Sequence, residues 1–132
     1  MRAIVLAAGK GKRLLSEQHD MPKVLRQANG KPLLGYVMDN LSFLSPRAVT
    51  VVVGYRRELV QDYLGDGVQY AIQQQQLGTG HAVNVARALF EDYDGPVLVC
   101  YGDMPLLKRE TFRQMLDTHR QQHNDCTILT GV

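Results

Sequence analysis

The chain has 132 residues, of which 45% are hydrophobic and 21% charged, and its formal net charge is +2. The length suits one domain with one core, and the composition excludes a disordered or membrane-spanning chain. The longest apolar run, residues 3–8, is too short to cross a bilayer and no secretory signal is recognisable, so we expect a cytoplasmic protein without a membrane partner.

The predicted elements alternate between apolar strands and amphipathic helices. In chain order we expect a strand over 2–8, a helix over 32–44, a strand over 48–53, a short helix over 58–64, a strand over 68–72, a helix from 79 to about 89, a strand over 97–101, a helix over 109–121 and a fifth strand over 126–130. Continuous apolar strands separated by helices predict a doubly wound, mainly parallel α/β sheet of the Rossmann-like kind. Since the fifth strand falls at the end of the sequence, we expect the fold to be truncated after it.

The two cysteines, Cys100 and Cys126, both fall in predicted buried strands. This placement favours reduced core thiols over a disulfide or a metal site. Positive charge gathers near the N-terminus, where residues 1–32 hold seven Lys or Arg against two Asp or Glu. A small concentrated patch suits a polyphosphate better than a nucleic-acid track, so no nucleic-acid partner is expected, although a solvated basic loop is the simpler alternative.

The loops that follow the carboxyl ends of parallel strands are the places where ligands bind in such sheets. The first of these loops begins Gly9-Lys10-Gly11-Lys12-Arg13. A dinucleotide-binding turn would need a third glycine where Leu14 stands, and the P-loop pattern GxxxxGK[ST] is absent. Backbone N–H groups at these glycines can approach an anion, which the flanking cations neutralise. A plain turn explains the glycines but not the cations.

Lys23 follows this loop, and Pro22 fixes the backbone immediately before it. Alone, Lys23 is read more simply as a surface lysine, whereas beside the glycine turn it becomes a candidate phosphate ligand. Further along, Leu77-Gly78-Thr79-Gly80-His81-Ala82 opens a predicted helix after a run of glutamines. Its glycines allow close approach to a flat ligand such as a nucleobase, and the glutamines can donate and accept hydrogen bonds. A glycine-capped helix start is the alternative, and His81 is more often structural than catalytic.

Asp103 lies just past the fourth predicted strand, within Tyr101-Gly102-Asp103-Met104-Pro105-Leu106. A carboxylate in this position can hold Mg²⁺ while phosphates and water complete the coordination. Asp-x-Pro is also a common turn, which would be the preferred interpretation if Asp103 stood alone. Its place beside the other two loops favours the metal site.

Together these motifs resemble the nucleotidyltransferase fold of sugar-nucleotide pyrophosphorylases, and in particular the uridyltransferase domain of bacterial N-acetylglucosamine-1-phosphate uridyltransferase. That family carries LAAGxGTRM, PKVL, a glutamine before QLGTGHA, and YGDxPL. The matching segments here are Leu6-Ala7-Ala8-Gly9-Lys10-Gly11-Lys12-Arg13-Leu14, Pro22-Lys23-Val24-Leu25, Gln73 before Gln76-Leu77-Gly78-Thr79-Gly80-His81-Ala82, and Tyr101-Gly102-Asp103-Met104-Pro105-Leu106. The four motifs stand in the family's order across most of the chain.

The resemblance implies that UMP passes from UTP to a sugar-1-phosphate, with N-acetylglucosamine-1-phosphate as the expected acceptor, and that pyrophosphate leaves. It implies a role in cell-envelope biosynthesis, substrates of nucleoside triphosphate and sugar phosphate, and a possible oligomer. Residues 1–132 would then form the nucleotide-binding part of the domain, without the sugar-binding half. By position, the resemblance implies Arg13 and Lys23 as catalytic residues, Asp103 as the Mg²⁺ ligand, and as nucleotide-binding residues Leu6, Ala7, Ala8, Gly9, Gly11, Gln73, Gly78, Thr79, Tyr101 and Gly102.

Three departures from the family pattern stand out. Lys12 replaces the family's Thr or Ser, and the loop between Gly9 and Lys23 is about three residues longer than usual. The family's sugar-binding residues and a second metal ligand come from a later part of the domain. Two alternatives therefore stay open: a cytidylyltransferase acting on a small alcohol phosphate, and a non-catalytic nucleotide-binding module.

Overall fold

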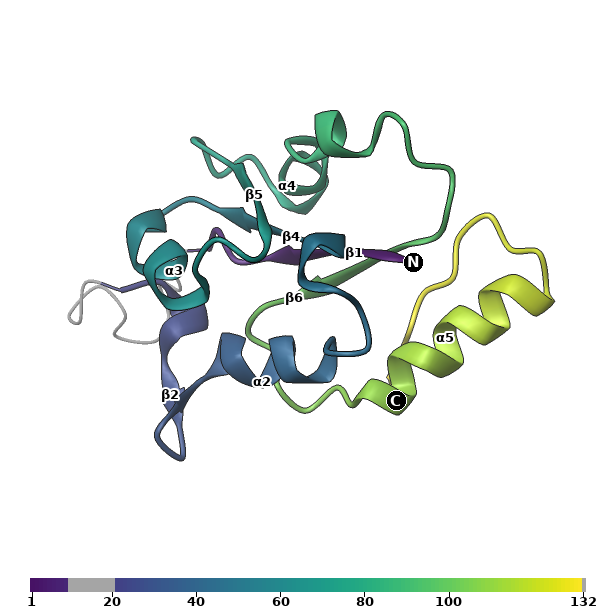
Figure 1. Cartoon of the computed structure of the whole chain (residues 1–132), viewed down its shortest axis with the longest axis horizontal. Coiled ribbons are helices and arrows are strands. Elements are labelled where there is room, and N and C mark those ends of the chain that lie inside the picture. The colour runs from purple at the N-terminus through teal and green to yellow at the C-terminus, as the bar shows by residue number, and fades with distance from the viewer. Residues whose placement is uncertain (10–20, 132) are drawn as a thin grey trace.

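The computed structural model describes residues 1–9 and 21–131. Four parallel strands form the central sheet in the order β5-β4-β1-β6, where β1 is Arg2–Leu6, β4 Val49–Val53, β5 Gln69–Ile72 and β6 Val97–Tyr101 (Figure 1). β1 is central, and its last residue Leu6 pairs with Val52 of β4 and with Tyr101 of β6. The predicted mainly parallel sheet is confirmed, and the register brings the carboxyl ends of β1 and β6 to the same edge.

Helices cover both faces of this sheet (Figure 1). One face carries α2 (Leu33–Asn40), α3 (Arg57–Leu64) and α5 (Arg109–Gln121), and the other carries α4 (Thr79–Asn84) and the 3-10 helix η3 (Arg87–Phe90). Alternate residues of β1 enter different cores: Val5 packs in the cluster on the α2 face, and Ile4 in the cluster on the α4 face. A strand buried on both faces needs apolar residues at nearly every position, which explains the apolar runs of β1 and β4. In the edge strand β6, by contrast, Val97, Val99 and Tyr101 are exposed.

Two predicted helices are shorter than expected. The helix expected over 32–44 ends at Asn40, and the one expected from residue 79 to about 89 divides into α4 and η3. The apolar spacing continues past Asn40 because Leu41 and Leu44 also pack against the core, although turns rather than helix carry them there. Periodicity therefore located the buried positions correctly but not the helix ends.

A small hairpin was not predicted. It joins β2 (Gln27–Ala28) to β3 (Lys31–Pro32), follows the short 3-10 helix η1 (Lys23–Leu25), and turns at Asn29 and Gly30, whose φ angles are 53° and 76°. Asn-Gly with two positive φ angles is the turn that two-residue hairpins prefer. The dipeptide is the signal that would have revealed this hairpin. A further 3-10 helix, η2 (Pro46–Ala48), leads into β4.

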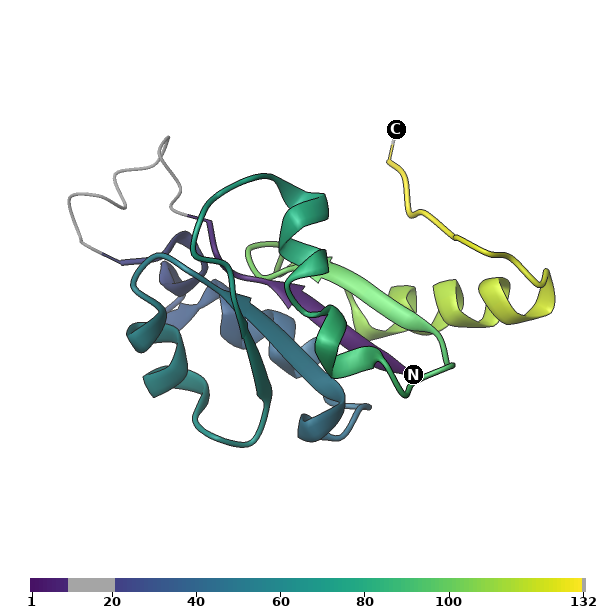
Figure 2. The ribbon, with the colours of Figure 1, turned by 90° about the horizontal axis from the view of Figure 1, so that it is seen from above.

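The fifth strand, expected over 126–130, is wrong. These residues form no strand, and Figure 2 shows the segment running away from the end of α5 without joining the sheet. The beginning of the segment contacts α5 and the turn after it: His119 Nδ1, near the end of α5, lies 3.0 Å from Thr127 Oγ1, and Asn124 Nδ2, just past the helix, donates to the same oxygen at 3.1 Å. Cys126, expected in the core, is consequently exposed, whereas Cys100 is buried as predicted.

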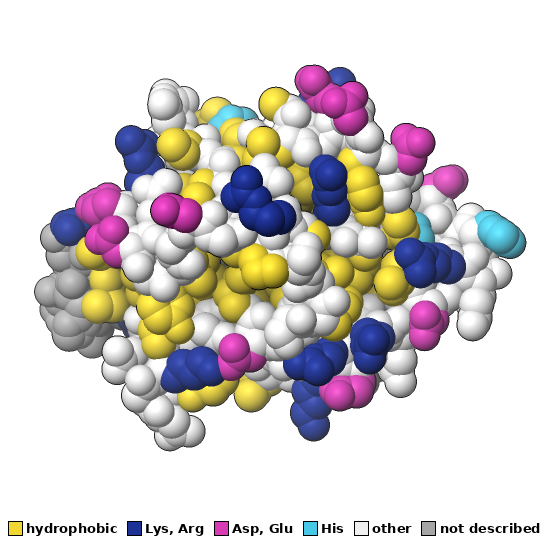
Figure 3. Space-filling model, viewed as in Figure 1, with side chains coloured by type: hydrophobic (Ala, Val, Ile, Leu, Met, Phe, Trp, Pro, Cys, Tyr) yellow, Lys and Arg dark blue, Asp and Glu magenta, His cyan; other side chains and the backbone are white. Residues whose placement is uncertain are grey.

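The surface in Figure 3 carries Lys and Arg side chains scattered among Asp and Glu, without a continuous basic track on this face. Lys10, Lys12 and Arg13, which contribute much of the predicted basic patch, lie outside the described residues. Within the described ranges, no helix combines the length and apolar character needed to cross a membrane.

Candidate functional site

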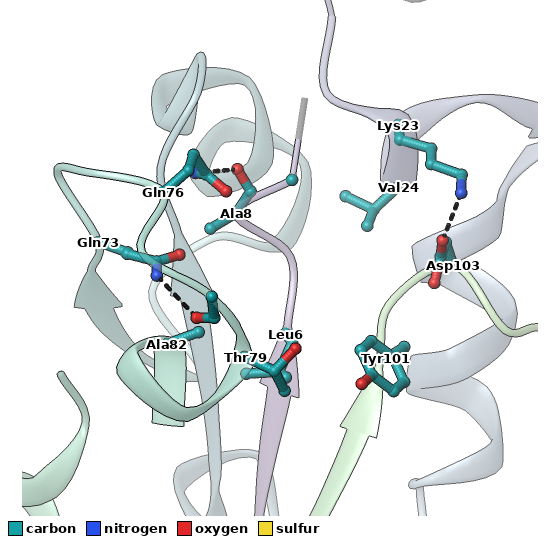
Figure 4. A pocket seen from close by; sticks show the side chains of 12 residues that line it. Leu6, Ala8, Lys23, Val24, Gln73, Gln76, Thr79, Ala82, Tyr101 and Asp103 are labelled. Carbon is teal, nitrogen blue, oxygen red and sulfur yellow. Dashed lines mark hydrogen bonds and ion pairs between the residues drawn. The ribbon is translucent and has the colours of Figure 1, made fainter. Parts of the chain in front are cut away.

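A cavity of about 230 Å³ opens at the carboxyl edge of the sheet, above the ends of β1 and β6 and beside the start of α4 (Figure 4). All three loops singled out from the sequence contribute to it, together with η1. Its lining consists of Leu6, Ala8, Gly9, Lys23, Val24, Gln73, Gln76, Gly78, Thr79, Ala82, Tyr101 and Asp103.

The end of β1 forms the floor of this cavity. Leu6 and Ala8 share one side of the chain and line the cavity, whereas Ala7 packs in the opposite core with 1% of its surface exposed. The Ala7 N–H donates to Val52 O at 2.9 Å, which continues the β1–β4 ladder one residue past the strand. Among the residues that the structure describes, none has an atom within 4 Å of a Cβ added to Gly9.

Amide groups from the loop between β5 and α4 form one side of the cavity. Gln73 is only 3% exposed, and its Nε2 lies 3.3 Å from Gly78 O and 2.9 Å from Nδ1 of His81. Gln76 reaches across to the segment just after β1, where its Nε2 donates to Ala8 O at 2.8 Å. Gly78 precedes α4 with a φ of 106°, a left-handed conformation that favours glycine. This side therefore presents neutral donors and acceptors held in fixed orientations.

Charged groups lie on the opposite side of the cavity (Figure 4). Lys23 Nζ and Asp103 Oδ2 form an ion pair at 2.9 Å, with 36% and 25% of the two side chains exposed. Gly102 lies beneath them, where its N–H donates to Leu6 O at 2.9 Å, and an added Cβ would come within 3.0 Å of Val24. A side chain at residue 102 would therefore push against Val24 and shift η1, the 3-10 helix that carries Lys23.

The ion pair is easily exchanged for other partners. Pairs between partly exposed charges contribute only about 0–1 kcal/mol, because water screens them and both side chains lose freedom. An anion can therefore compete for the Lys23 ammonium, and a cation for the Asp103 carboxylate, at little cost. Among the described residues no group of three or more His, Cys, Asp and Glu side chains could by itself enclose a metal ion. A single carboxylate fits Mg²⁺ only where ligand oxygens and water supply the remaining positions.

The structure brings nine of the thirteen predicted site residues to this cavity: Leu6, Ala8, Gly9, Lys23, Gln73, Gly78, Thr79, Tyr101 and Asp103. Ala7 and Gly102 support it from below without lining it, and Gly11 and Arg13 lie outside the described residues. Three lining residues were not singled out from the sequence: Val24, Gln76 and Ala82. Each of the three stands inside one of the quoted motifs, so its position next to a predicted site residue is the signal that could have identified it.

The buried thiol does not belong to this site. Cys100 packs in the core on the α2 face, and burial raises the pKa of its thiol to about 12. A thiol that stays protonated at neutral pH is a poor nucleophile. The polar side-chain groups that the cavity lining does offer are amides, hydroxyls, one ammonium and one carboxylate.

Comparison with known proteins places these features in context. The family model described as the MobA-like NTP transferase domain matches residues 3–131. The bifunctional protein GlmU of Latilactobacillus sakei is 44% identical to the chain over 130 residues, which is 98% of this chain but 28% of that protein. The chain thus spans less than a third of the length of this relative.

Solved structures share the fold at lower identity. The manganese complex of the Rv0371c protein from Mycobacterium tuberculosis H37Rv aligns with a TM-score of 0.71 at 20% identity, covering 91% of this chain and 59% of that one. UDP-glucose pyrophosphorylase complexed with UDP-glucose also aligns with a TM-score of 0.71 at 20% identity, covering 92% of this chain and 54% of that one. At this identity the likeness supports the fold alone.

Proposed function

The chain belongs to the MobA-like NTP transferase domain family, and on that premise we propose that it carries the nucleotide-binding part of a sugar-1-phosphate uridyltransferase. The proposed reaction transfers UMP from UTP to N-acetylglucosamine-1-phosphate and releases pyrophosphate. The similarity to bifunctional GlmU proteins supports this choice within the family.

The observation that carries the proposal is the division of the cavity into a neutral side and a charged side (Figure 4). A nucleoside triphosphate has the same division, with a flat base of amide-like groups at one end and a polyanion at the other. The amide groups of the neutral side match the base, and the charged groups of the other side match the phosphates. Neither a uniformly apolar nor a uniformly basic ligand would use both sides.

On the neutral side, Gln73, Gly78 and Thr79 would bind the uracil. Figure 4 shows the Gln73 side chain in the cavity wall, with its nitrogen turned toward the loop and its oxygen toward the opening. That oxygen can accept the N–H between the two carbonyl groups of uracil. Gly78, which has no side chain, allows the base to approach the backbone at the start of α4.

On the charged side, Lys23 would exchange Asp103 for a phosphate of the nucleotide. Asp103 would then hold the divalent cation by carboxylate oxygen, with Mg²⁺ as the proposed ion. When bound, such an ion neutralises phosphate charge and favours departure of pyrophosphate. Tyr101, at the end of β6, lies on the same side of the cavity as Asp103 (Figure 4). Arg13, outside the described residues, remains the proposed second cation for the triphosphate.

The chemistry proposed for these residues is an in-line substitution at phosphorus. A phosphate oxygen of the sugar-1-phosphate forms a bond to the α-phosphorus of UTP while the bond from that phosphorus to the oxygen bridging the α- and β-phosphates breaks. That oxygen leaves with the β- and γ-phosphates as pyrophosphate. The chain's contribution is to hold the base, so that the α-phosphorus has a fixed position, and to neutralise charge with Lys23. Positioning and charge neutralisation suffice for phosphoryl-type transfers, which need no protein nucleophile.

The test is nucleotide binding by Asp103→Asn and Lys23→Met in the 132-residue chain, with UTP titrated in the presence and absence of Mg²⁺. We expect Asp103→Asn to remove the Mg²⁺-dependent gain in UTP affinity, and Lys23→Met to weaken UTP more than uridine, which lacks phosphates. Asp62→Asn is the matched control, because Asp62 is exposed on α3 and does not line the cavity. Unchanged metal dependence in Asp103→Asn would remove Asp103 from the site, and tighter binding of CTP than UTP would favour the cytidylyltransferase.

A further inference from the structure

His81 lies directly behind the cavity wall rather than in it. Its imidazole Nδ1 is 2.9 Å from Nε2 of Gln73, and the ring is half-buried on α4. The same Gln73 nitrogen lies 3.3 Å from the carbonyl oxygen of Gly78. Gln73 does line the cavity, so the imidazole reaches the cavity only through the Gln73 amide.

These contacts decide which way the Gln73 amide points. A backbone carbonyl oxygen can only accept a hydrogen bond, so the group facing Gly78 O must be the NH₂ of Gln73. The NH₂ has a second hydrogen, and Nδ1 of His81 lies 2.9 Å from the same nitrogen, where the tautomer with its hydrogen on Nε2 can accept it. With both hydrogens directed away from the ligand, the Gln73 oxygen is the atom left facing the cavity (Figure 4).

We propose that His81 is a positioning residue for base selection, because it holds the Gln73 amide with its oxygen toward the nucleobase. This inference rests on the proposed nucleotide function. Uracil presents an N–H at ring position 3 and satisfies an oxygen acceptor. Cytosine presents an unprotonated nitrogen there, which faces the Gln73 oxygen as one acceptor against another. An amide that turned over would present NH₂ to the base and remove the discrimination.

The imidazole is the stronger of the two restraints on the amide. Its contact is 2.9 Å, at the usual distance for a hydrogen bond, whereas the hydrogen bond to Gly78 O is longer, at 3.3 Å, and therefore weaker. Gln73 is 3% exposed, so water has little access to replace a lost partner. Losing the imidazole acceptor would leave one amide hydrogen unsatisfied in the buried wall and lower the cost of turning the amide over.

Two substitutions separate the acceptor from the bulk of the ring. His81→Phe keeps a planar ring but places a carbon where Nδ1 was, so the acceptor is lost. His81→Asn is smaller but places an oxygen on the same side-chain atom that carries Nδ1, so the acceptor is kept. Asn84→Ala is the matched control, because Asn84 is exposed on the same helix. Affinities of the 132-residue chain for UTP and CTP are measured at one Mg²⁺ concentration, and the readout is their ratio.

We expect His81→Phe to reduce the preference for UTP over CTP by about threefold to tenfold, the value of one hydrogen bond. His81→Asn should stay within about twofold of the unsubstituted chain, as should Asn84→Ala. Equal weakening of UTP and CTP by His81→Phe would overturn the inference, because a merely structural histidine lowers both affinities and leaves the ratio unchanged. A ratio lost equally in His81→Asn and His81→Phe would overturn it as well.

The same measurements distinguish failure of the proposed function from failure of the inference about His81. The proposed function is tested by the unsubstituted chain alone, which should bind UTP more tightly than CTP. If that chain binds neither nucleotide or prefers CTP, uridine specificity is refuted, and the inference about His81 is refuted with it. If that chain prefers UTP and His81→Phe keeps the full preference, only the inference about His81 fails.

Discussion

Gly54, which follows β4, supports the candidate site from below, and replacing it with alanine tests how closely the loop after β5 is packed. A Cβ added there would lie 2.9 Å from the backbone oxygen of Gln73, 3.1 Å from Ala8 Cβ and 3.2 Å from Gln76 Nε2. Three cavity residues thus converge on one glycine. The Gln73 backbone cannot simply recede, because its N–H donates to Val53 O at 2.8 Å.

The first of these contacts is several tenths of an ångström too short for van der Waals contact, and its partner is backbone rather than a flexible side-chain end. Overpacking of this kind costs about 1–3 kcal/mol. For a chain of this length about 4 °C of melting temperature corresponds to 1 kcal/mol. We therefore expect Gly54→Ala to lower the melting temperature by about 4–12 °C and, by moving Gln73 and Gln76, to weaken UTP binding by up to about tenfold.

Thermal unfolding followed by circular dichroism, together with a UTP titration, measures both effects. Gly80→Ala is the matched control, because an added Cβ there meets nothing within 4 Å and the residue lies inside α4. Alanine in place of glycine in a helix stabilises by about 0.5–1 kcal/mol, so this variant should melt slightly higher. A Gly54→Ala chain that melts with the unsubstituted protein, or a Gly80→Ala chain that loses as much stability as Gly54→Ala, would refute the packing argument.

The remaining predictions concern the thiols and the core. Cys126 should react with a thiol reagent at neutral pH and Cys100 only after unfolding, because the first is exposed and the second is buried with a pKa of about 12. The pKa of the Cys100 thiol is higher in the folded chain, about 12, than the value near 9 expected in the unfolded chain. The free energy of unfolding should therefore fall as pH rises from about 9 to about 12, and it should fall less in Cys100→Ala. Equal falls in the two proteins would contradict this prediction. Leu34→Ala should cost about 2–5 kcal/mol in chemical denaturation, because Leu34 is 0% exposed, whereas Leu106→Ala, at 89% exposure, should cost little; similar losses would mean that Leu34 is not a core residue.

The pattern of apolar residues was sufficient to predict the four strands of the parallel sheet. The strand over 97–101 and the helix over 109–121 were predicted with the bounds that the structure gives. Both have strong local signals, a continuous apolar run in the first and a single apolar stripe in the second. The segment over 126–130 has a strand-like pattern too, yet a strand also needs a neighbour with free backbone groups. Thr127 instead contacts His119 of α5 and Asn124 just past that helix, and no local pattern reveals these contacts.

Motif positions were sufficient to find most of the cavity lining, because carboxyl ends of parallel strands meet at one edge of the sheet. They did not give the direction of each side chain. Ala7 stands within the first motif, yet the alternation of β1 turns it into the core on the α2 face. Gln76 and Val24 stand inside quoted motifs as well, and only the packing of their loops against β1 and Gly102 brings them to the cavity.

The sequence by itself determined the fold class and the family resemblance, since both depend on residue types repeated at fixed spacing. Only the tertiary structure decided that Lys23 pairs with Asp103, that Gln73 is buried, and that His81 supports it from behind. Lys23 and Asp103 stand 80 positions apart in the chain. Which groups form hydrogen bonds depends on differences of a few tenths of an ångström in the distances between them. The folded sheet sets those distances, and the order of residues alone does not.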